Sequence, residues 1–413
     1  MTRRLWLLVI LTGSIVTAAA QRNPSNAQVE WLYYGGDAGG SKYSPLAGIT
    51  VANINRLQVA WQWKHWEMPL DAYGTTPGPF ESTPLMIDDV LYVTTPYNSI
   101  AALEAETGKE LWRFDGEAYK LGQLLSASGW KLRGTAFWRD GNRVVIFLNS
   151  RDRLFALDAR TGQLVHSFGN DGVVSLTAGL SRVSEPKHVT QSSPPVVYRD
   201  LVILGSQVPD RVQLPDPVGQ VQAFNARTGE RVWTFSVIPQ SARDPGADTW
   251  EDETWRTNGH GNVWAPMALD EARGLLYLPT STPSSDYYGG QRPGANLFAE
   301  SIVCLEAATG KLKWYFQTVH HGLWDWDIPA QPNLVTITVD GQRIDGVAQV
   351  TKRGDTFVFD RVTGKPVWPI VERSVPVVTD VPGEKPYPTQ PFPTKPPPFV
   401  EQGVLLDDAN NLT

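Results

Sequence analysis

Apolar and polar residues alternate along most of the chain in short runs, and turn-forming residues separate one run from the next. The alternation is clear in residues 84–95, 143–150, 194–206 and 274–281, which are rich in Val, Ile, Leu and Tyr. A period of two places successive side chains on opposite faces of an extended chain, so these runs predict β-strands. No helical period lies between them. The pattern therefore predicts an all-β protein.

Five segments repeat one motif: an apolar strand, a Thr-Gly turn, and a second strand that closes on Trp or, once, on His. They are residues 102–112, 156–166, 223–233, 304–314 and 358–368. Glycine accepts the positive φ that a tight turn requires, and the closing Trp offers a broad surface for packing between sheets. Repetition of one such unit predicts a β-propeller of four-stranded blades, with about five or six blades in this chain.

The spacing of the repeats predicts long loops. Successive turn glycines lie 54 to 81 residues apart, whereas a four-stranded blade needs about 40–45 residues. Loops on one face of a propeller are where such folds carry their chemistry. Residues 51–63 are expected to form a further strand ahead of the first unit. Nine prolines in residues 376–398 disfavour a regular strand there, so we expect the propeller to lack its C-terminal blades.

Composition narrows the classes of function. Hydrophobic residues make up 41% of the chain and charged residues 19%, with 36 Gly and 32 Pro, which excludes a coiled coil, a helical bundle and a disordered chain. The formal net charge of −7 argues against nucleic-acid binding, which needs a basic face. Cys304 is the single cysteine, so no internal disulfide, cysteine-rich metal site or covalently attached c-type haem is expected.

The first twenty residues have the composition of a targeting segment. Arg3 and Arg4 precede an apolar stretch that closes on three alanines, as in a secretory signal peptide. The alternative is a membrane anchor, but polar residues interrupt the stretch before it reaches the roughly 20 apolar residues that a span requires. We therefore expect residues 1–20 to be a signal peptide and residues 21–413 to form the propeller. The protein would be periplasmic or otherwise exported, and soluble or peripheral to the inner membrane.

Four stretches are more specific than the repeat. They are GGDAGGSKYSPL (35–46), NVWAPMALD (262–270), YFQTVHHGLWDWDIPAQPNL (315–334) and TKRGDTFVFDRVTGKPV (351–367). With them the sequence resembles the pyrroloquinoline quinone (PQQ) dependent dehydrogenases over nearly all of the chain after the signal peptide. It is most similar to the membrane-type glucose and quinate dehydrogenases. The resemblance implies an eight-bladed propeller that holds PQQ and a divalent ion, Ca²⁺ or Mg²⁺, near its axis.

Two residues would carry the reaction. By the resemblance, Asp325 is the catalytic base, which takes the proton of the substrate hydroxyl while the hydride moves to the C5 carbonyl of PQQ. Lys352 would lie on the quinone oxygens, where its charge stabilises the negative charge that develops. The alternatives are that Asp325 caps a turn, the role expected of Asp327, and that Lys352 is a solvated surface lysine.

Five further residues would bind the cofactor. Trp264 matches the tryptophan on which the planar ring stacks. Glu81 and Arg133 match positions that bind the carboxylates and oxygens of PQQ, and Thr190 and Ser192 would add hydrogen bonds. The alternatives are blade packing for Trp264 and a buried structural ion pair for Glu81 and Arg133.

The metal ligands are expected in two loops. Asp210 and Thr282 stand where the alcohol-oxidising relatives have Glu and Asn, and Ca²⁺ prefers several such oxygen ligands. His320 and His321 look like a metal-binding pair. Because neighbouring residues of an extended strand face opposite sides, we assign both histidines to the framework.

The sequence departs from the family pattern in two places. Residues 126–128 read Ser-Ala-Ser, where the alcohol-dehydrogenase branch has adjacent cysteines; the glucose-type relatives lack that pair too. Trp138 stands where the glucose-type relatives have His, a change expected to alter the affinity or access of the cofactor.

These features favour an exported PQQ-dependent dehydrogenase that oxidises a hydroxyl of a sugar, polyol or other alcohol and passes the electrons to a membrane quinone. Two alternatives remain open. One is a non-catalytic propeller that serves as a protein-binding scaffold, and the other is an inactive truncated relative with exposed strand edges. A scaffold needs no loop Asp, Lys and stacking Trp together, which favours the enzyme.

Overall fold

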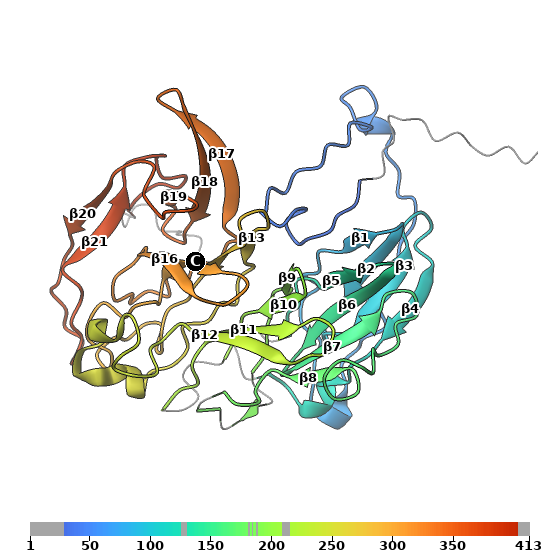
Figure 1. Cartoon of the computed structure of the whole chain (residues 1–413), viewed down its shortest axis with the longest axis horizontal. Coiled ribbons are helices and arrows are strands. Elements are labelled where there is room, and N and C mark those ends of the chain that lie inside the picture. Colours follow the sequence, from blue (N-terminus) through green and yellow to red (C-terminus); the bar gives the residue numbers. More distant parts are fainter. Residues whose placement is uncertain are drawn as a thin grey trace, which may run out of the picture.

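The computed structural model describes residues 29–124, 130–180, 182–183, 185–186, 189–208 and 215–403. The predicted signal peptide (1–20), residues 126–128 and Asp210 lie outside these residues. Within them, antiparallel sheets follow one another in sequence order. Figure 1 shows the sheets side by side in an arc, from β1–β4 in blue and teal to β20 and β21 in red.

Four of the sheets are four-stranded meanders. Their strands are β1 (Leu85–Ile87), β2 (Val90–Thr94), β3 (Ile100–Glu104) and β4 (Glu110–Phe114); β5 (Ala136–Asp140), β6 (Arg143–Ser150), β7 (Arg153–Asp158) and β8 (Val173–Ser175); β9 (Val196–Tyr198), β10 (Leu201–Leu204), β11 (Gln220–Asn225) and β12 (Arg231–Ser236); and β13 (Ala268–Asp270), β14 (Leu275–Pro279), β15 (Ser301–Glu306) and β16 (Leu312–Gln317).

The chain continues with a smaller sheet and a ribbon. The fifth sheet holds β17 (Asn333–Val339), β18 (Gln342–Val350) and β19 (Thr356–Asp360), and β20 (Ile370–Ser374) pairs with β21 (Thr389–Pro393). The predicted all-β propeller of four-stranded blades is therefore confirmed. Where the sequence predicts about five or six blades, the described residues form four full blades, a three-stranded fifth and a two-stranded ribbon.

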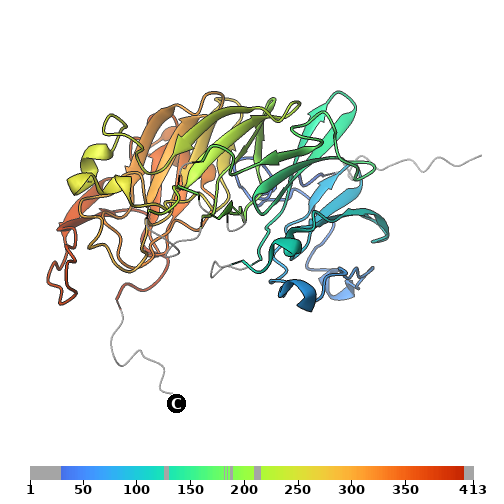
Figure 2. The same ribbon diagram turned by 90° about the horizontal axis from the view of Figure 1, so that it is seen from below.

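Short 3₁₀ helices interrupt the loops. They are η2 (Ile54–Arg56), η3 (Asp71–Tyr73), η4 (Ala118–Leu121), η6 (Ala247–Thr249) and η7 (Glu251–Arg256). The last two lie in the long connection between β12 and β13, at the outer side of the sheets (yellow in Figure 2). In the part of the chain that the structure describes, no helix has the length and apolar character needed to cross a membrane.

The tryptophan that closes a repeat docks on the turn of the next blade. In four junctions the indole Nε1 donates to a backbone carbonyl three residues before a turn glycine: Trp61 to Ala105 (3.1 Å), Trp112 to Ala159 (2.9 Å), Trp233 to Ala307 (3.2 Å) and Trp314 to Arg361 (3.2 Å). The ring covers the glycine closely, because a Cβ atom on Gly162 would lie 2.5 Å from Trp112. The Thr-Gly-Trp repeat is therefore a contact between blades as well as a turn.

Two of the five repeats depart from the predicted hairpin. In the second, which closes on His166, the return strand is reduced to one bridge between Leu157 and Leu164, and β8 completes the blade instead. In the fifth, the corresponding bridge joins Phe359 and Pro366. Proline has no N–H with which to continue a ladder.

Two predictions about the connecting segments are wrong. Residues 51–63 form η2 and an extended stretch without ladder pairing instead of a strand. Trp61 nevertheless fills the docking position at the first blade, and Trp63 packs beside it on β2 and β3. Conversely, β21 lies inside the proline-rich segment 376–398. It pairs only with β20, and an edge position tolerates proline because one side of the strand needs no N–H.

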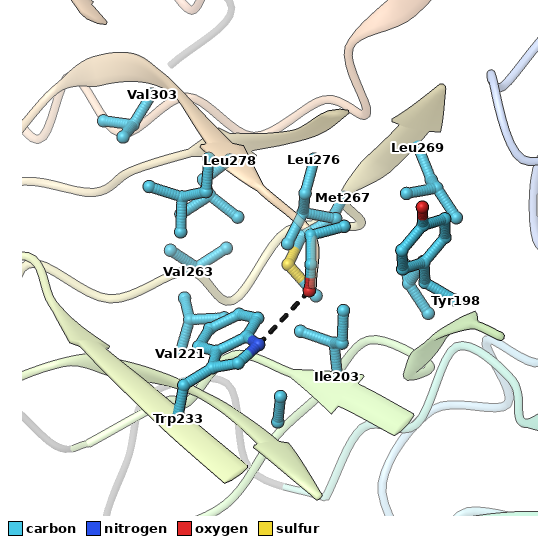
Figure 3. Close-up of a cluster of buried hydrophobic side chains, with 14 of the residues drawn as sticks. Tyr198, Ile203, Val221, Trp233, Val263, Met267, Leu269, Leu276, Leu278 and Val303 are labelled. Carbon is cyan, nitrogen blue, oxygen red and sulfur yellow. Dashed lines mark hydrogen bonds between the residues drawn. The ribbon is translucent and has the colours of Figure 1, made fainter. Parts of the chain in front are cut away.

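The hydrophobic core lies between successive sheets. Separate clusters of buried side chains join the first sheet to the second, the second to the third, the third to the fourth, and the fourth to the fifth. Figure 3 shows the third of these interfaces, where Ile203 and Val221 lie near Leu276 and Leu278 and Trp233 donates its hydrogen bond. Full burial of one such aliphatic side chain contributes about 1.5–3 kcal/mol, so each blade is stabilised by its neighbours.

A glycine-rich segment links the beginning of the arc to later blades. Trp31 forms a bridge to β1, and the carbonyls of Ala38 and Gly39 accept hydrogen bonds from the amides of Leu269 and Leu334, both at 2.8 Å. A Cβ atom on Gly39 would come within 3.0 Å of Leu334. The Gly-Gly-Asp-Ala-Gly-Gly stretch therefore consists mostly of residues with small side chains, because the segment passes close to the fifth blade.

Candidate functional site

The predicted site residues occupy equivalent positions in successive blades. Each lies three to eight residues before the innermost strand of its blade: Glu81 before β1, Arg133 before β5, Ser192 before β9, Trp264 before β13 and Asp325 before β17. The inner strands contact one another, β5 with β9, β9 with β13, and β13 with β17. The fold therefore gathers residues from five blades at one end of the sheets. Together with Lys352, which follows β18, we call these residues the site cluster.

Arg133 is central to one side of the site cluster. Its guanidinium donates a hydrogen bond to Oγ of Ser192 at 2.8 Å and lies 3.5 Å from the carboxylate of Glu81. The same group lies 5.4 Å from the centre of the Trp264 ring, and Lys131 reaches the Glu81 carboxylate at 3.5 Å. The ion pair between Glu81 and Arg133 exists, but both side chains are partly exposed. This side of the cluster is a cationic edge that solvent reaches.

Trp264 is held at both of its ends. Its carbonyl accepts hydrogen bonds from Oγ of Ser192 at 3.3 Å and Oγ of Ser193 at 2.6 Å. Its indole Nε1 donates to Oδ2 of Asp327 at 2.8 Å, and the other oxygen of Asp327 accepts from the amide of Thr282 at 2.6 Å. Asp327 therefore tethers the indole instead of capping a turn, and the expectation for it was wrong. Neither Ser193 nor Asp327 was assigned to the site from the sequence.

Asp325 and Lys352 form the other side of the site cluster. Lys352 Nζ lies 3.0 Å from Oδ1 of Asp325, donates to the Asp325 carbonyl at 2.7 Å, and lies 3.9 Å from Asp327. Burial and the nearby Asp327 carboxylate raise the pKa of Asp325, whereas Lys352 opposes the rise. A partly exposed carboxylate with a raised pKa is suited to accept a proton from a bound hydroxyl.

The backbone at Asp325 is held in an unusual conformation. Its φ is 53°, in the left-handed region, which costs a residue with a side chain on the order of 1–3 kcal/mol. Its amide donates to the carbonyl of Asp286 at 3.1 Å. The surrounding contacts therefore hold the Asp325 side chain where the loop alone would not.

The remaining predicted residues are placed as follows. Thr190 is buried, and its backbone pairs in both directions with Gln207. Thr282 is fully buried, and its Oγ1 donates to Glu300 at 3.0 Å. The Thr282 hydroxyl keeps lone pairs for a cation, and oxygen donors suit Ca²⁺. Asp210 lies outside the described residues, and among those described no group of three His, Cys, Asp or Glu is arranged to hold a metal.

A buried charged group behind the Asp325 loop was missed in the sequence. Glu300 directly precedes β15 and is completely buried, and burial raises its pKa to about 7. Arg292 is also completely buried, which lowers its pKa, and it donates to the carbonyl of Gly322 at 2.6 Å and to Asn296 at 3.1 Å. The sequence signal that could have revealed Glu300 is a carboxylate directly before the mostly apolar run Ser-Ile-Val-Cys-Leu. Burial of an unpaired charge beside such a run costs free energy.

Three residues singled out in the sequence contact the framework. The ring of His320 contacts Glu372 at 3.2 Å, and the ring of His321 contacts Glu384 at 3.2 Å. The two histidines therefore have separate partners, in agreement with a framework role. Trp138 is buried in the core between the second and third blades. The expectation that it alters the affinity or access of the cofactor stays a prediction.

The site cluster has the features that PQQ requires. PQQ is a planar tricyclic quinone that carries several carboxylates. Trp264 provides a flat aromatic face in a fixed orientation, and Arg133 and Lys131 on one side and Lys352 on the other provide positive charge. Guanidinium and ammonium groups are the partners that carboxylates and reduced quinone oxygens prefer. The residues present therefore fit this cofactor.

Comparisons with known proteins agree with this geometry. The family model of the glucose/ethanol/alcohol dehydrogenase β-propeller domain matches residues 31–413. The chain is 35% identical over 388 residues to the glycerol dehydrogenase large subunit of Gluconobacter oxydans (strain 621H). This alignment covers 91% of this chain and 51% of the relative. It is 34% identical over 396 residues to the quinoprotein glucose dehydrogenase of Escherichia coli (strain K12). This alignment covers 91% of this chain and 48% of the relative.

A solved structure shows the same fold. The quinohemoprotein alcohol dehydrogenase from Comamonas testosteroni matches with a TM-score of 0.69 at 25% identity, over 89% of this chain and 52% of that one. The chain thus spans about half the length of the curated relatives it matches. These similarities confirm the resemblance that the sequence motifs indicated.

Proposed function

Because this chain belongs to the glucose/ethanol/alcohol dehydrogenase β-propeller family, we propose that it is the PQQ-binding part of a dehydrogenase that oxidises the CH–OH group of an alcohol or sugar. The observation that carries the proposal is the pairing of Asp325 with Lys352 at 3.0 Å, within the cluster that also holds the tethered indole of Trp264. A base, a cation and a flat aromatic face are the groups that this chemistry needs.

The two sides of the site cluster would bind the cofactor together. PQQ, when bound, supplies the electrophilic carbonyl that accepts the hydride from the carbinol carbon. Trp264 would support its ring, and Arg133, with Glu81, Thr190 and Ser192, would hold its polar edge. The Trp264 orientation does not depend on the cofactor, because its N–H is already bonded to Asp327.

Asp325 is the group that would take the hydroxyl proton. Lys352 keeps this carboxylate ionised until a proton arrives, since its charge lies 3.0 Å from Oδ1. Asp327 cannot serve equally well, because each of its oxygens already accepts a hydrogen bond. Lys352 would also stabilise negative charge that develops on the neighbouring quinone oxygens.

A cleft beside Lys352 offers space for the substrate. It has a volume of about 850 Å³, and its lining includes Trp324, Trp326 and Tyr387 as well as Lys352. The names of the two relatives above refer to glycerol and glucose. We therefore propose an alcohol or a sugar as the substrate; of the site cluster, Lys352 is the residue that lines this cleft.

Three further parts complete the proposal; the first two rest on the family resemblance and the third on the composition of residues 1–20. A divalent ion, Ca²⁺ or Mg²⁺, would bind at Asp210 and Thr282. Electrons would pass from the reduced cofactor to a membrane quinone. Export to the periplasm would follow from residues 1–20, with the protein soluble or peripheral to the inner membrane.

The decisive experiment is a PQQ titration of the purified chain with and without Ca²⁺, followed by tryptophan fluorescence. We expect saturable quenching, lost in Trp264→Leu and kept in Trp63→Leu, which removes a tryptophan outside the site cluster. Turnover of glycerol, glucose and simple alcohols with an artificial electron acceptor would then be measured on the loaded protein. A folded chain that shows no quenching at any PQQ concentration would contradict the proposal. The chain would then be a non-catalytic scaffold or an inactive relative.

A further inference from the structure

A single buried carboxylate links the start of the loop that carries Asp325 to Thr282, whose amide binds Asp327 at the end of that loop. Oε2 of Glu300 accepts a hydrogen bond from the amide of Gly322 at 3.0 Å, and Oε1 accepts one from Oγ1 of Thr282 at 3.0 Å. Glu300 is in close contact with the loop, because a Cβ atom on Gly322 would lie 1.8 Å from Oε1. A larger residue at position 322 would therefore displace the Glu300 carboxylate.

One partner of Glu300, Gly322, lies in the loop three residues before Asp325. The other partner, Thr282, lies outside the loop, and its amide binds Asp327, two residues after Asp325, at 2.6 Å. The carboxylate of Glu300 therefore restrains the start of the 322–327 segment directly and its end through Thr282. β15, which begins directly after Glu300, anchors this carboxylate in the fourth blade.

We propose that Glu300 is a positioning residue, which holds the Asp325 carboxylate at the place where it meets the substrate hydroxyl. This inference rests on the proposed function. A displacement of a catalytic group by about 1 Å costs on the order of 10²-fold in rate, so a group that restrains the start of the loop directly and its end through Thr282 should affect turnover. Glu300 itself is buried and is not among the residues that line the cleft beside Lys352.

Other contacts separate positioning from general stability. Arg292 binds the Gly322 carbonyl at 2.6 Å and the Ser285 carbonyl at 3.0 Å, and Asp327 remains bonded to Trp264. These bonds do not involve Glu300. Without Glu300, the loop and the indole platform would stay attached to the fold, while the Gly322 amide would lose its acceptor and the Thr282 hydroxyl would lose its fixed partner.

The test compares three substitutions in the PQQ-loaded protein: Glu300→Met, Glu300→Gln and, as a matched control at the other end of β15, Glu306→Met. Methionine fills a similar volume but accepts neither bond. Glutamine retains both, because its amide oxygen accepts from Gly322 and its amide nitrogen donates to the Thr282 hydroxyl. We expect Glu300→Met to lower kcat about tenfold or more, with KM and the PQQ Kd changed by less than about twofold. Glu300→Gln should restore most of kcat, and Glu306→Met should resemble the unmodified chain.

A second readout requires no cofactor. Hydrogen exchange of the amides of residues 319–327, measured in the protein without PQQ, should be faster in Glu300→Met and unchanged in Glu300→Gln and Glu306→Met. Unchanged exchange and turnover in Glu300→Met, or equal loss of turnover in the Gln variant, would overturn the positioning role. If Glu300→Met does not fold, Glu300→Asp, which is too short to reach both partners, serves with the same readouts. A chain that never binds PQQ contradicts the proposed function, while the exchange experiment still decides whether Glu300 holds the loop.

Discussion

Two stretches of one loop carry the same residue type in different surroundings. At Asp327 the side chain is buried, and its two oxygens accept hydrogen bonds from Trp264 and Thr282. At Asp325 the side chain is about one-third exposed, the backbone is left-handed, and the carboxylate faces Lys352. Only one residue separates the two aspartates in the sequence.

The difference shows that local contacts give the two carboxylates different roles. Both oxygens of Asp327 already accept buried hydrogen bonds, and a proton on either oxygen would weaken them at a cost in free energy. The Asp325 carboxylate is partly exposed and faces Lys352, so a bound hydroxyl can reach it. Asp327 is therefore suited to fix the indole, and Asp325 to react.

The largest expected effect comes from removing the proton acceptor. Asp325→Asn should lower turnover by about 10²–10⁴-fold and leave PQQ binding intact, because the Trp264 and Arg133 side of the cluster does not contact this carboxylate. Turnover with an artificial acceptor and fluorescence titration measure the two effects. Asp380→Asn, on the exposed part of the chain, is the matched control. Turnover in Asp325→Asn within about tenfold of the unmodified chain would exclude Asp325 as the base.

Changing the other carboxylate should affect stability more than chemistry. Asp327→Asn leaves the Trp264 indole or the Thr282 amide without an acceptor, so the free energy of unfolding should fall by about 1–3 kcal/mol. Urea denaturation measures this loss, and PQQ affinity should fall with it. Combining Asp327→Ala, which removes both acceptor oxygens, with Trp264→Phe gives the control, because both substitutions remove the bond between the indole and Asp327 and their effects should not fully add. Full additivity would show that this tether contributes nothing.

The pH dependence of turnover tests the electrostatic part of the comparison. Asp325 must be ionised to accept a proton, and its pKa is raised by burial and by Asp327. Turnover should therefore decline on the acid side at a higher pH than for an ordinary aspartate. Since Lys352 lowers this pKa, Lys352→Met should move the acid limb to still higher pH, whatever its effect on the maximal rate. A limb that stays in place in Lys352→Met would mean that another group titrates.

The smallest effects concern two blade junctions. Trp112→Phe removes the indole N–H that bonds to Ala159 and should lower the free energy of unfolding by about 1 kcal/mol. The corresponding residue of the second repeat, His166, is mostly exposed and pairs with Asp171, so His166→Ala should change stability by less than about 0.5 kcal/mol. Thermal unfolding of both variants gives the comparison, and equal destabilisation would contradict the docking role of the tryptophan.

Much of the fold could be predicted because its signals are local. The Thr-Gly turns need a positive φ, and Gly108, Gly162, Gly229, Gly310 and Gly364 all show one. The failures also have local causes. Pro366 cannot continue a ladder, and residues 51–63 use Trp61 and Trp63 to pack on the first blade without forming a strand.

The residues of the candidate site could be predicted one by one from the motifs, but their contacts with one another could not. The motifs singled out Glu81, Arg133, Ser192, Trp264, Asp325 and Lys352, and the fold places them at one end of the inner strands. Thr190 and Thr282 are buried, and the amide of Thr282 binds Asp327. The contacts of Asp327 and Glu300 could not be predicted, because their partners lie 18 to 63 residues away in other strands and loops.

The amino-acid pattern was enough to predict most of the strands, the turns, the repeat that stacks one blade on the next, and the family to which the chain belongs. Those properties depend on alternation, on glycine at left-handed positions and on short motifs, all of which are read along the chain. Which of two neighbouring aspartates accepts two buried hydrogen bonds, and which faces Lys352, could be seen only in the folded chain. That choice depends on donors from other blades, and their positions follow from how the blades pack.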